Sequence, residues 1–379
     1  MKKLLAIMCL VGMFSGILFP ETTSVWATEV ENVNSKETIG VEAVSIEREA
    51  SNMLSEVGTL SVKESLIVGD IRVPLYVTFD SQEQALQNIS DNSVILLIKG
   101  TYGYEDISNE NWKEYYDAMY ELIDLSSKPT WYTEADANFK MLRKFFDIYE
   151  NEEKNVAIMS NVSTAMTTAE VTQNTNILEL LPYDSYVTLS EQSTVLNNNQ
   201  ALVTASTSGF NITNGITYAT KYAEKANTTD YKKFSKDCTN FTSQILENGG
   251  VTQEVYDDES KGWWHTKSKV LGVTVHDHSI SWINANTFAR YMGVGYTTTS
   301  NASFSSNIQK GDFIVADYEN DGDWNHMGFV TDKKSSKTNG YYDYKVAQHT
   351  SNYHAWTSSD TNGWENIGND GGKYGRVRR

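Results

Sequence analysis

Short apolar runs bounded by turn residues recur in the first third of the chain. They are rich in Val, Ile, Leu, Tyr and Phe, and we predict β-strands at 66–68, 75–79 and 94–98. Two helical patterns follow, with large apolar residues at three- and four-residue spacing over 112–123 and 139–149. Because this spacing gathers the aromatic rings on one face of each helix, we expect them to form the core of a mixed α/β N-terminal domain.

The pattern changes twice in the second half of the chain. Residues 186–211 are rich in Ser, Thr, Asn and Gln and show little periodicity, which is typical of a linker. A helix is then predicted from Asp237, which can cap its N-terminus, through an apolar face to a pair of glycines. Further on, the strand-like segments 326–331 and 341–350 flank a turn-like stretch and predict an antiparallel hairpin. We therefore place a second domain at 212–379.

Cys238 falls in the first turn of the predicted helix, directly after its cap. There the free N–H groups and the positive end of the helix dipole stabilise a thiolate, which is the form of cysteine that attacks a carbonyl carbon. The neighbouring carboxylate of Asp237 opposes this effect, so a nucleophilic Cys238 also needs a histidine to take its proton. The alternative is a small buried cysteine that only packs beneath a helix.

The predicted hairpin supplies two histidines. If it is symmetric about the turn-like residues 335–340, His326 lies directly opposite His349 on the same face, with Cβ atoms about 5 Å apart. This arrangement fits a cysteine hydrolase in which His326 is the base and His349 orients its imidazole, with Asn352 as the alternative orienting residue. A shift of the register by one residue would send one ring to the other face of the sheet. The alternative is that both histidines are ordinary strand residues.

The start of the chain has the pattern of a secretory signal peptide. Two lysines precede an apolar run at 4–19, and a cleavage point is predicted after Ala27. The run is short for a membrane anchor, and no later apolar run is long enough to span a membrane. Cleavage removes Cys9 and leaves Cys238 in a chain that begins with a flexible lead at 28–42. We expect the protein to be secreted or associated with the cell envelope.

A set of short motifs in a fixed order is the most specific signal in the second half of the chain. The motifs are Asp237–Phe241, Ser243–Gln244, Gly249–Gly250, Ser281–Trp282, Gly311–Ile314, His326–Thr331 and His349–Thr350. Together they resemble the "putative amidase domain" family of secreted Gram-positive bacterial proteins, which is similar to the papain-like cell-wall hydrolases of the NlpC and CHAP types. The resemblance covers about residues 212–379, and residues 28–210 resemble no family that we can name.

The resemblance implies an α+β fold of the papain-like type, in which a helix bearing the cysteine packs on an antiparallel sheet bearing the histidines. It also implies amide hydrolysis without a cofactor, with peptidoglycan stem peptides or their link to the glycan as the substrate. By position, Cys238 matches the nucleophile, His326 the base and His349 the third polar residue. Asp237 and Gln244 belong to the same motifs and are expected to support the site. The oxyanion donors beyond the backbone N–H of Cys238 are left open.

Two clusters offer metal-binding alternatives. Acidic residues at alternate positions resemble the start of a calcium loop: Asp317, Glu319, Asp321 and Asp323. The twelfth position of such a loop would be Gly328 and not the bidentate Glu, so we prefer an acidic turn that leads into the strand of His326. A zinc enzyme is the other alternative, although the chain lacks an HExxH pattern. Its ligands would be His265, His276 and His278.

The formal charge of −18 lies almost entirely in the first half of the chain. Residues 28–210 hold 11 Lys and Arg against 29 Asp and Glu, whereas residues 211–379 hold 18 against 19. This acidity argues against nucleic acid as a partner, while the near-neutral second half can approach an anionic wall polymer. A non-catalytic wall-binding module and a cysteine acyltransferase are the alternatives to a hydrolase. The N-terminal domain, at 43–185, is either a targeting module or an inhibitory segment.

Overall fold

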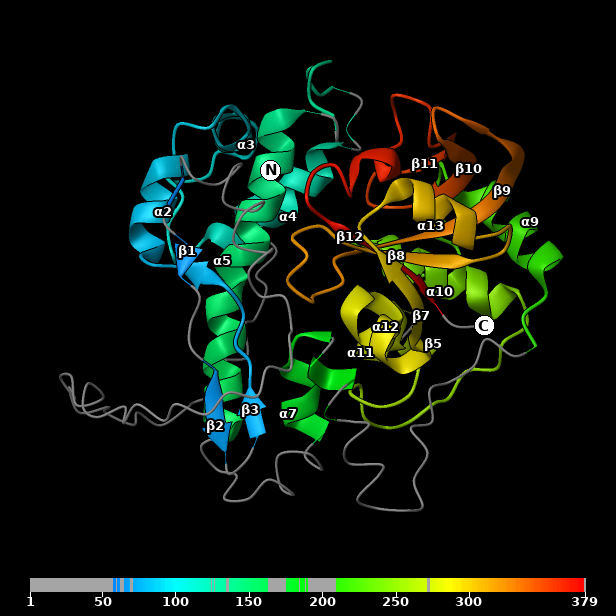
Figure 1. Ribbon diagram of the computed structural model, residues 1–379, viewed down its shortest axis with the longest axis horizontal. Helices are drawn as coiled ribbons and strands as arrows, with labels where there is room; N and C mark the ends of the chain where they lie inside the picture. Colours follow the sequence, from blue (N-terminus) through cyan, green and yellow to red (C-terminus); the bar gives the residue numbers. More distant parts are fainter. Residues whose placement is uncertain are drawn as a thin grey trace, which may run out of the picture. The chain divides into compact units, whose positions relative to one another are not determined.

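The computed structural model describes residues 57–58, 60–61, 65–68, 71–123, 125, 127–133, 136–162, 175–183, 185–187, 189, 209–270 and 273–377, all within one compact unit that spans 43–379 (Figure 1). The predicted leader with its cleavage point after Ala27, the flexible lead at 28–42 and most of the predicted linker at 186–211 lie outside these residues. Among the helices that are described, none is both long and apolar enough to cross a membrane.

The first part of the described chain is mostly helical. Its helices are α2 (Gln82–Ile89), α3 (Ser93–Tyr102), α4 (Trp112–Ile123), α5 (Ala137–Val162) and α7 (Thr175–Leu180). Its strands are short and form two antiparallel pairs, β1 (Leu60–Ser61) with β4 (Thr78–Phe79) and β2 (Leu66–Val68) with β3 (Ile71–Val73). The strand predicted at 66–68 is thus confirmed, and the one predicted at 75–79 is shortened to its last two residues.

The prediction of a strand at 94–98 is wrong, because this run lies in the N-terminal part of the helix α3. Asn92 caps the helix by accepting a hydrogen bond from the backbone N–H of Val94, and Gly103 ends it with a φ of 70°. A short continuous apolar run fits a buried helix as well as a strand, so its periodicity alone does not distinguish the two.

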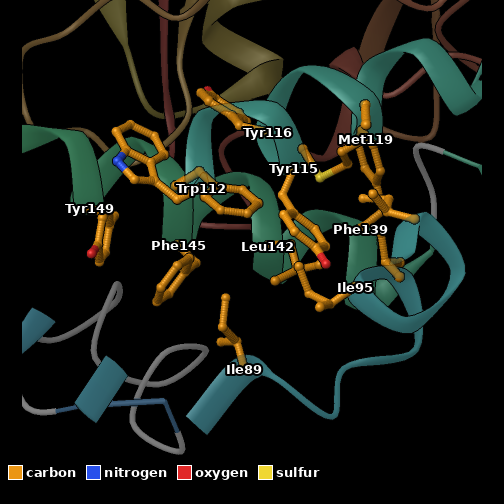
Figure 2. Packing of buried hydrophobic residues seen from close by; sticks show 14 of the residues in the cluster. Ile89, Ile95, Trp112, Tyr115, Tyr116, Met119, Phe139, Leu142, Phe145 and Tyr149 are labelled. Atoms are coloured by element: carbon orange, nitrogen blue, oxygen red, sulfur yellow. The ribbon is translucent and has the colours of Figure 1, made fainter. Parts of the chain in front are cut away.

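The aromatic stripes of α4 and α5 form a core, as the sequence predicts (Figure 2). Trp112 stacks against Phe146 with ring centroids 6.2 Å apart, and Tyr116 stacks against the same ring at 5.1 Å. Phe139 and Phe145 are fully buried in the same cluster. The three- and four-residue spacing therefore directs these rings inward, where they hold the two helices together.

A six-stranded antiparallel sheet is the centre of the second part, with the strand order β11-β10-β9-β8-β12-β7. Its strands are β7 (Val294–Thr298), β8 (Phe313–Asp317), β9 (His326–Thr338), β10 (Tyr341–Gln348), β11 (Tyr353–Trp356) and β12 (Lys373–Val377). A separate hairpin consists of β5 (His265–Val270) and β6 (Val273–His278). The helices are α9 (Ile212–Tyr222), α10 (Cys238–Asn248), α11 (Ile280–Ile283), α12 (Ala285–Met292), α13 (Asn301–Asn307) and the 3₁₀ turn η1 (Trp364–Asn366).

Alternate residues of the sheet face two separate apolar cores. Phe313 and Val315 of β8 belong to the core that contains α10, whereas Ile314 and Ala316 belong to the core that contains Phe304 of α13. This division follows from the two-residue period of a strand. Because α10 packs against β9, the cysteine at the start of the helix and the histidine at the start of the strand are brought together. The mixture of helices and an antiparallel sheet confirms the α+β class.

The hairpin of β9 and β10 is not symmetric about residues 335–340. Its turn is Asn339–Gly340, with φ of 56° and 87°, so that Tyr341 pairs with Thr338. An Asn-Gly pair favours such a two-residue turn because both of its positions adopt positive φ. Two register shifts follow along β10, and Ala347 pairs with Phe329. Near the end of β10, the pairing of β10 with β9 is therefore displaced by one residue from the expected register.

Candidate active site

Cys238 is the first residue of α10, as the sequence predicts, and it is buried. Asp237 occupies the N-cap position, but its side chain makes no capping hydrogen bond to the helix. Its Oδ1 instead accepts hydrogen bonds from the backbone N–H of Phe234 at 3.0 Å and from Nδ2 of Asn240 at 2.7 Å. The expected cap is thus replaced by contacts that fix the loop in front of the cysteine.

The hydroxyl of Thr350 takes over the capping role. Its Oγ1 accepts hydrogen bonds from the backbone N–H groups of Asp237 at 2.9 Å and Cys238 at 3.1 Å. Thr350 has a φ of 81°, a conformation that is strained for a β-branched residue. The backbone N–H of Cys238, the one oxyanion donor expected from the sequence, is therefore already paired with a side chain of the protein.

His326, the first residue of β9, interacts with the thiol of Cys238. Burial alone would raise the pKa of Cys238, but the charge of His326 and its hydrogen bond to the thiol lower it, with smaller contributions from Thr239 and the backbone of Met327. The net result is a pKa below the ordinary value for a cysteine, which increases the share of thiolate. The structure thus brings the first two predicted site residues together, and each is only 5% exposed.

Gln348, the last residue of β10, holds the other side of the His326 ring. Its Oε1 lies 2.9 Å from Nε2 of His326 and accepts a hydrogen bond from the indole N–H of Trp364 at 2.7 Å. Its Nε2 donates to the carbonyl of Ser351 at 3.3 Å. Since Trp364 can only donate, Oε1 is the acceptor and Nε2 of His326 carries the proton. The neutral ring therefore has its lone pair on Nδ1, the nitrogen left for the thiol.

His349 faces away from this pair, toward Tyr222 of α9 and Phe241 of α10. Its Nδ1 lies 2.6 Å from Oδ2 of Asp237, and its Nε2 lies 2.8 Å from the carbonyl oxygen of Tyr222. Its ring stacks on Phe241 with centroids 3.8 Å apart. The expected opposition of the two histidines is wrong, because the register shifts in the hairpin exchange the faces on which residues 348 and 349 lie.

The other two supporting residues predicted from the sequence have different surroundings. Oε1 of Gln244 accepts a hydrogen bond from the hydroxyl of Tyr218 at 2.8 Å, within the core beside α10. Asn352 follows β10 and lines a cavity of about 530 Å³ together with Lys140 and other polar residues. The position predicted for Asn352, next to the imidazole of the base, is filled by Gln348.

The described residues contain no group of three or more His, Cys, Asp or Glu side chains placed to hold a metal ion. Of the calcium-loop candidates Asp317, Glu319, Asp321 and Asp323, the first accepts hydrogen bonds from the backbone N–H groups of Asp321 at 3.1 Å and of Gly322 at 2.9 Å. Asp321 accepts one from the backbone N–H of Asp323 at 3.0 Å, and Lys154 pairs with the carboxylate of Asp323. Asp317, Asp321 and Asp323 thus serve an acidic turn and its contact with α5, whereas both carboxylate oxygens of Glu319 are buried without a hydrogen-bond partner among the described residues.

The zinc alternative fails for a similar reason. Nε2 of His265 lies 2.9 Å from Nδ1 of His276, and the two rings stack with centroids 5.2 Å apart. Burial, together with the charges of His276, His278 and Lys267, lowers the pKa of His265 to about 4. These histidines therefore form a packed pair on the hairpin of β5 and β6, and His278 completes no metal site with them.

The geometry defines a class of site, namely a buried Cys–His–Gln arrangement between a helix N-terminus and an antiparallel sheet. Residues 209–372 match the family model described as "Putative amidase domain". The chain is also similar to two proteins of Bacillus subtilis (strain 168). It is 32% identical to "Uncharacterized protein YhbB" over 120 residues, which are 31% of this chain and 36% of that protein. It is 32% identical to "Uncharacterized protein YjcM" over 154 residues, which are 37% of this chain and 32% of that protein.

The matched segments thus span about a third of each of these relatives. No solved structure matches the chain. The amidase-domain match covers every residue of the site, since Cys238, His326 and Gln348 all lie within 209–372. It suggests amide hydrolysis for this part of the chain.

Sequence reasoning missed Gln348 and Trp364, and it included Thr350 in a motif without giving it a role. The Asn339–Gly340 pair was a usable signal, because it identifies the tight turn from which the register of the hairpin is counted. The register shifts that follow have no comparable signal in the sequence. Without them the face on which Gln348 lies is not determined.

Proposed function

We propose that this protein is a secreted cysteine amidase in which Cys238 is the nucleophile, His326 the base and Gln348 the orienting residue. The observation that carries the proposal is the hydrogen bond between His326 and the buried thiol of Cys238, which favours the thiolate, within a segment that matches an amidase domain. Burial without such a partner would raise the pKa of the thiol and leave it unreactive. The cysteine-bearing helix and the histidine-bearing antiparallel sheet also agree with a papain-like arrangement related to the NlpC and CHAP types.

In the proposed reaction, Nδ1 of His326 takes the proton of the Cys238 thiol, and the sulfur attacks the carbonyl carbon of an amide. The imidazolium then returns this proton to the leaving nitrogen, so that an amine departs and an acyl thioester remains on the sulfur. Water next gives a proton to Nδ1 and attacks the thioester, which releases a carboxylic acid and restores the thiol. Throughout the reaction, Oε1 of Gln348 accepts the hydrogen bond from Nε2–H of His326 and so keeps Nδ1 available for proton transfer.

The developing oxyanion requires a donor beside the sulfur. The backbone N–H of Cys238 is placed for this role but is bonded to Oγ1 of Thr350. Substrate binding would exchange this hydroxyl for the carbonyl oxygen of the amide. The reaction therefore includes a local rearrangement of the loop after β10.

The substrate class that we propose is peptidoglycan, at amide bonds of its stem peptides or at their link to the glycan. Three features of the sequence support this choice. The predicted leader would export the chain, the second half is nearly neutral and can approach an anionic wall polymer, and the motifs resemble those of cell-wall hydrolases.

The test is the release of free amino groups from purified peptidoglycan by the full chain and by Cys238→Ala. We expect wild-type chain to release amines and the variant to release none above background. Equal release by both proteins would exclude Cys238 as the nucleophile. Sedimentation of the chain with the wall, with no release by either protein, would favour a non-catalytic binding module.

A cysteine acyltransferase passes through the same thioester and is distinguished by its acceptor. Addition of a competing small amine would yield its acyl conjugate if transfer dominates, and mass spectrometry of the products would detect it. A hydrolase yields the free acid in the presence of the same amine.

A further inference from the structure

The proposed reaction centre is closed to a substrate of the size of a peptide. Cys238 and His326 are each 5% exposed, and Gln348 is 1% exposed. A small cavity lies beside Gln348, with a volume of about 20 Å³, which is room for about one water molecule, and neither Cys238 nor His326 lines it. Its walls include Gln348 and Trp364 from the site and Lys140 and Arg143 from α5. Helix α5, from the first part of the chain, thus forms one wall of the cavity beside Gln348, the residue that holds the His326 ring.

Helix α5 contacts the residues that support the imidazole. The guanidinium carbon of Arg143 lies 3.4 Å from the ring centroid of Tyr318, and the Tyr318 ring stacks on His326 with centroids 5.9 Å apart. Nζ of the next residue, Lys144, donates hydrogen bonds to the carbonyl oxygens of Tyr318, at 3.1 Å, and Asp370. Two consecutive side chains of α5 therefore hold the segment that covers His326.

Helix α4 contacts the segment in front of the nucleophile. Nζ of Lys236, two residues before Cys238, lies 3.2 Å from the ring centroid of Tyr116 and 5.9 Å from that of Tyr120. Burial lowers the pKa of Lys236, while the carboxylates of Glu150 and Asp147 on α5 act in the opposite direction. The loop of Lys236 is thus enclosed by aromatic rings and acids of the first part of the chain.

The contact between the two parts of the chain is rich in charge. Lys140 pairs with Asp370 at 3.0 Å, Lys154 pairs with Asp323, and Nδ2 of Asn151 donates to Asp321 at 3.0 Å. Because such groups regain water when they separate, a charged contact opens more readily than an apolar core does. The aromatic rings that hold α4 to α5, in contrast, form an uninterrupted core of their own.

We propose that α4 and α5 are an inhibitory cover that must move away from the acidic turn and the Lys236 loop before a substrate reaches Cys238. The inference rests on the proposed function, because it assigns the state of that same site. It gives the mixed α/β domain the second of the two roles considered from the sequence, that of an inhibitory segment. The full chain is then a slow enzyme rather than an inactive one, because the charged contact sets how often the cover opens.

The test weakens the contact without touching the site. Lys140→Glu sets a carboxylate against Asp370, and the double variant Lys140→Glu/Lys154→Glu does the same at Asp323. Two rates are measured on the full chain: alkylation of Cys238 by iodoacetamide, followed by mass spectrometry, and release of amines from peptidoglycan. We expect both rates to rise about threefold in the single variant and tenfold or more in the double variant.

Two further variants serve as controls. Lys113→Glu makes the same substitution on α4, where Lys113 pairs with Glu153 of α5 at 2.7 Å on the exposed side of the cover, so both rates should stay as in wild type. Lys140→Glu/Asp370→Lys reverses the ion pair and should restore the wild-type rates. Failure of this swap to restore them, or a rise in Lys113→Glu as large as that in Lys140→Glu, would attribute the effect to general loosening and overturn the proposal.

The two rates separate the cover from the chemistry. Faster alkylation without any release of amines would support the cover and contradict the amidase. Unchanged alkylation with rapid release by the wild-type chain would support the amidase and overturn the cover. Hydrogen exchange on the wild-type chain gives a second measurement that does not depend on variants. Amides of the acidic turn and of residues 234–237 should exchange faster than those of β9 and β10, and equal rates would count against separate opening.

Discussion

Gln348 and His349 are consecutive residues, yet they belong to two regions on opposite faces of the chain around Cys238. The reaction face holds the thiol, His326 and the amide of Gln348, in which one nitrogen of the imidazole is left for proton transfer. The supporting face holds Asp237, whose Oδ1 accepts from Phe234 and Asn240 and whose Oδ2 bonds to His349.

The difference shows what makes a histidine suitable as a base. Both nitrogens of His349 are occupied, one by a carboxylate and one by a backbone carbonyl, so the ring has no free position for a substrate proton. His326 has one nitrogen fixed by a neutral acceptor and the other directed to sulfur. The partners of each ring nitrogen therefore identify the base better than the number of histidines near the cysteine does.

The largest effect is expected from His326→Ala. Loss of the base should reduce kcat at least a thousandfold, because the thiol then has no group to accept its proton. It should also raise the pKa of Cys238, since the charge and the hydrogen bond that lower it are both removed. The pH dependence of alkylation measures this pKa. An unchanged alkylation profile would mean that His326 does not activate the thiol.

The supporting face is tested by His349→Ala. We expect a loss of about 2–4 kcal/mol in the free energy of unfolding, because the substitution leaves Oδ2 of the buried Asp237 without its partner and empties the space above Phe241. The kcat of the folded fraction should change less than threefold. Urea denaturation measures the first quantity and active-site titration the second. His349→Asn, which keeps a donor for Asp237, should lose less stability, and a kcat as low as that of His326→Ala would place His349 in the chemistry.

A smaller effect on the rate is expected from Gln348→Ala. The substitution removes the acceptor that keeps the proton on Nε2 of His326, so kcat should fall about ten- to a hundredfold while KM changes little. The free energy of unfolding should fall by about 1–3 kcal/mol, because the buried indole N–H of Trp364 loses its acceptor as well. Gln348→Glu is the matched control, because its carboxylate still accepts from His326 and Trp364. It should retain more activity than the alanine variant and move the alkaline limb of the pH profile upward. Equal activity of both variants and wild type would remove Gln348 from the site.

Much of this arrangement follows from local signals in the sequence. The position of Cys238 at the start of a helix, the α+β character of the second part and the aromatic core of α4 and α5 could all be predicted from spacing and turn residues. These features depend on contacts between residues close in the chain. The strand expected at 94–98 failed because all five residues are apolar, Leu96 among them although it is 51% exposed, so no polar position reveals the helical period.

The partner of His326 could not be predicted in the same way. The register of a hairpin depends on its turn and on every bulge in its two strands. One unnoticed bulge exchanges the two faces of a strand. The register shifts in β10 thereby replace His349 by Gln348. Likewise, the cover over the reaction face depends on side chains of α5 that lie more than 150 residues from their partners, such as Lys154 and Asp323. The spacing of residues along the sequence does not predict contacts at such separations.

The smallest effect that we expect is a pH dependence of stability arising in the inhibitory cover, which closes only the reaction face. Burial and the neighbouring Glu150 raise the pKa of Asp147 on α5 to about 7, whereas an aspartate in an unfolded chain ionises near 3.9. Between these values the folded chain binds a proton that the unfolded chain does not. The stabilising contribution of Asp147 is therefore fully present below about pH 4 and is lost as the pH rises through 7.

We expect the urea midpoint to fall between pH 5 and pH 8, and Asp147→Asn, which stays neutral, to show a shallower fall. The hydroxyl of Tyr116 donates to Asp147 and can donate equally to the asparagine, so the variant should fold. The decisive measurement is the difference between the two midpoints at each pH, since buried acids that Asp147 does not influence, such as Asp317, act on both proteins alike. A difference that stays constant from pH 5 to pH 8 would show that Asp147 does not titrate in this range. The cover would then rest on its ion pairs alone.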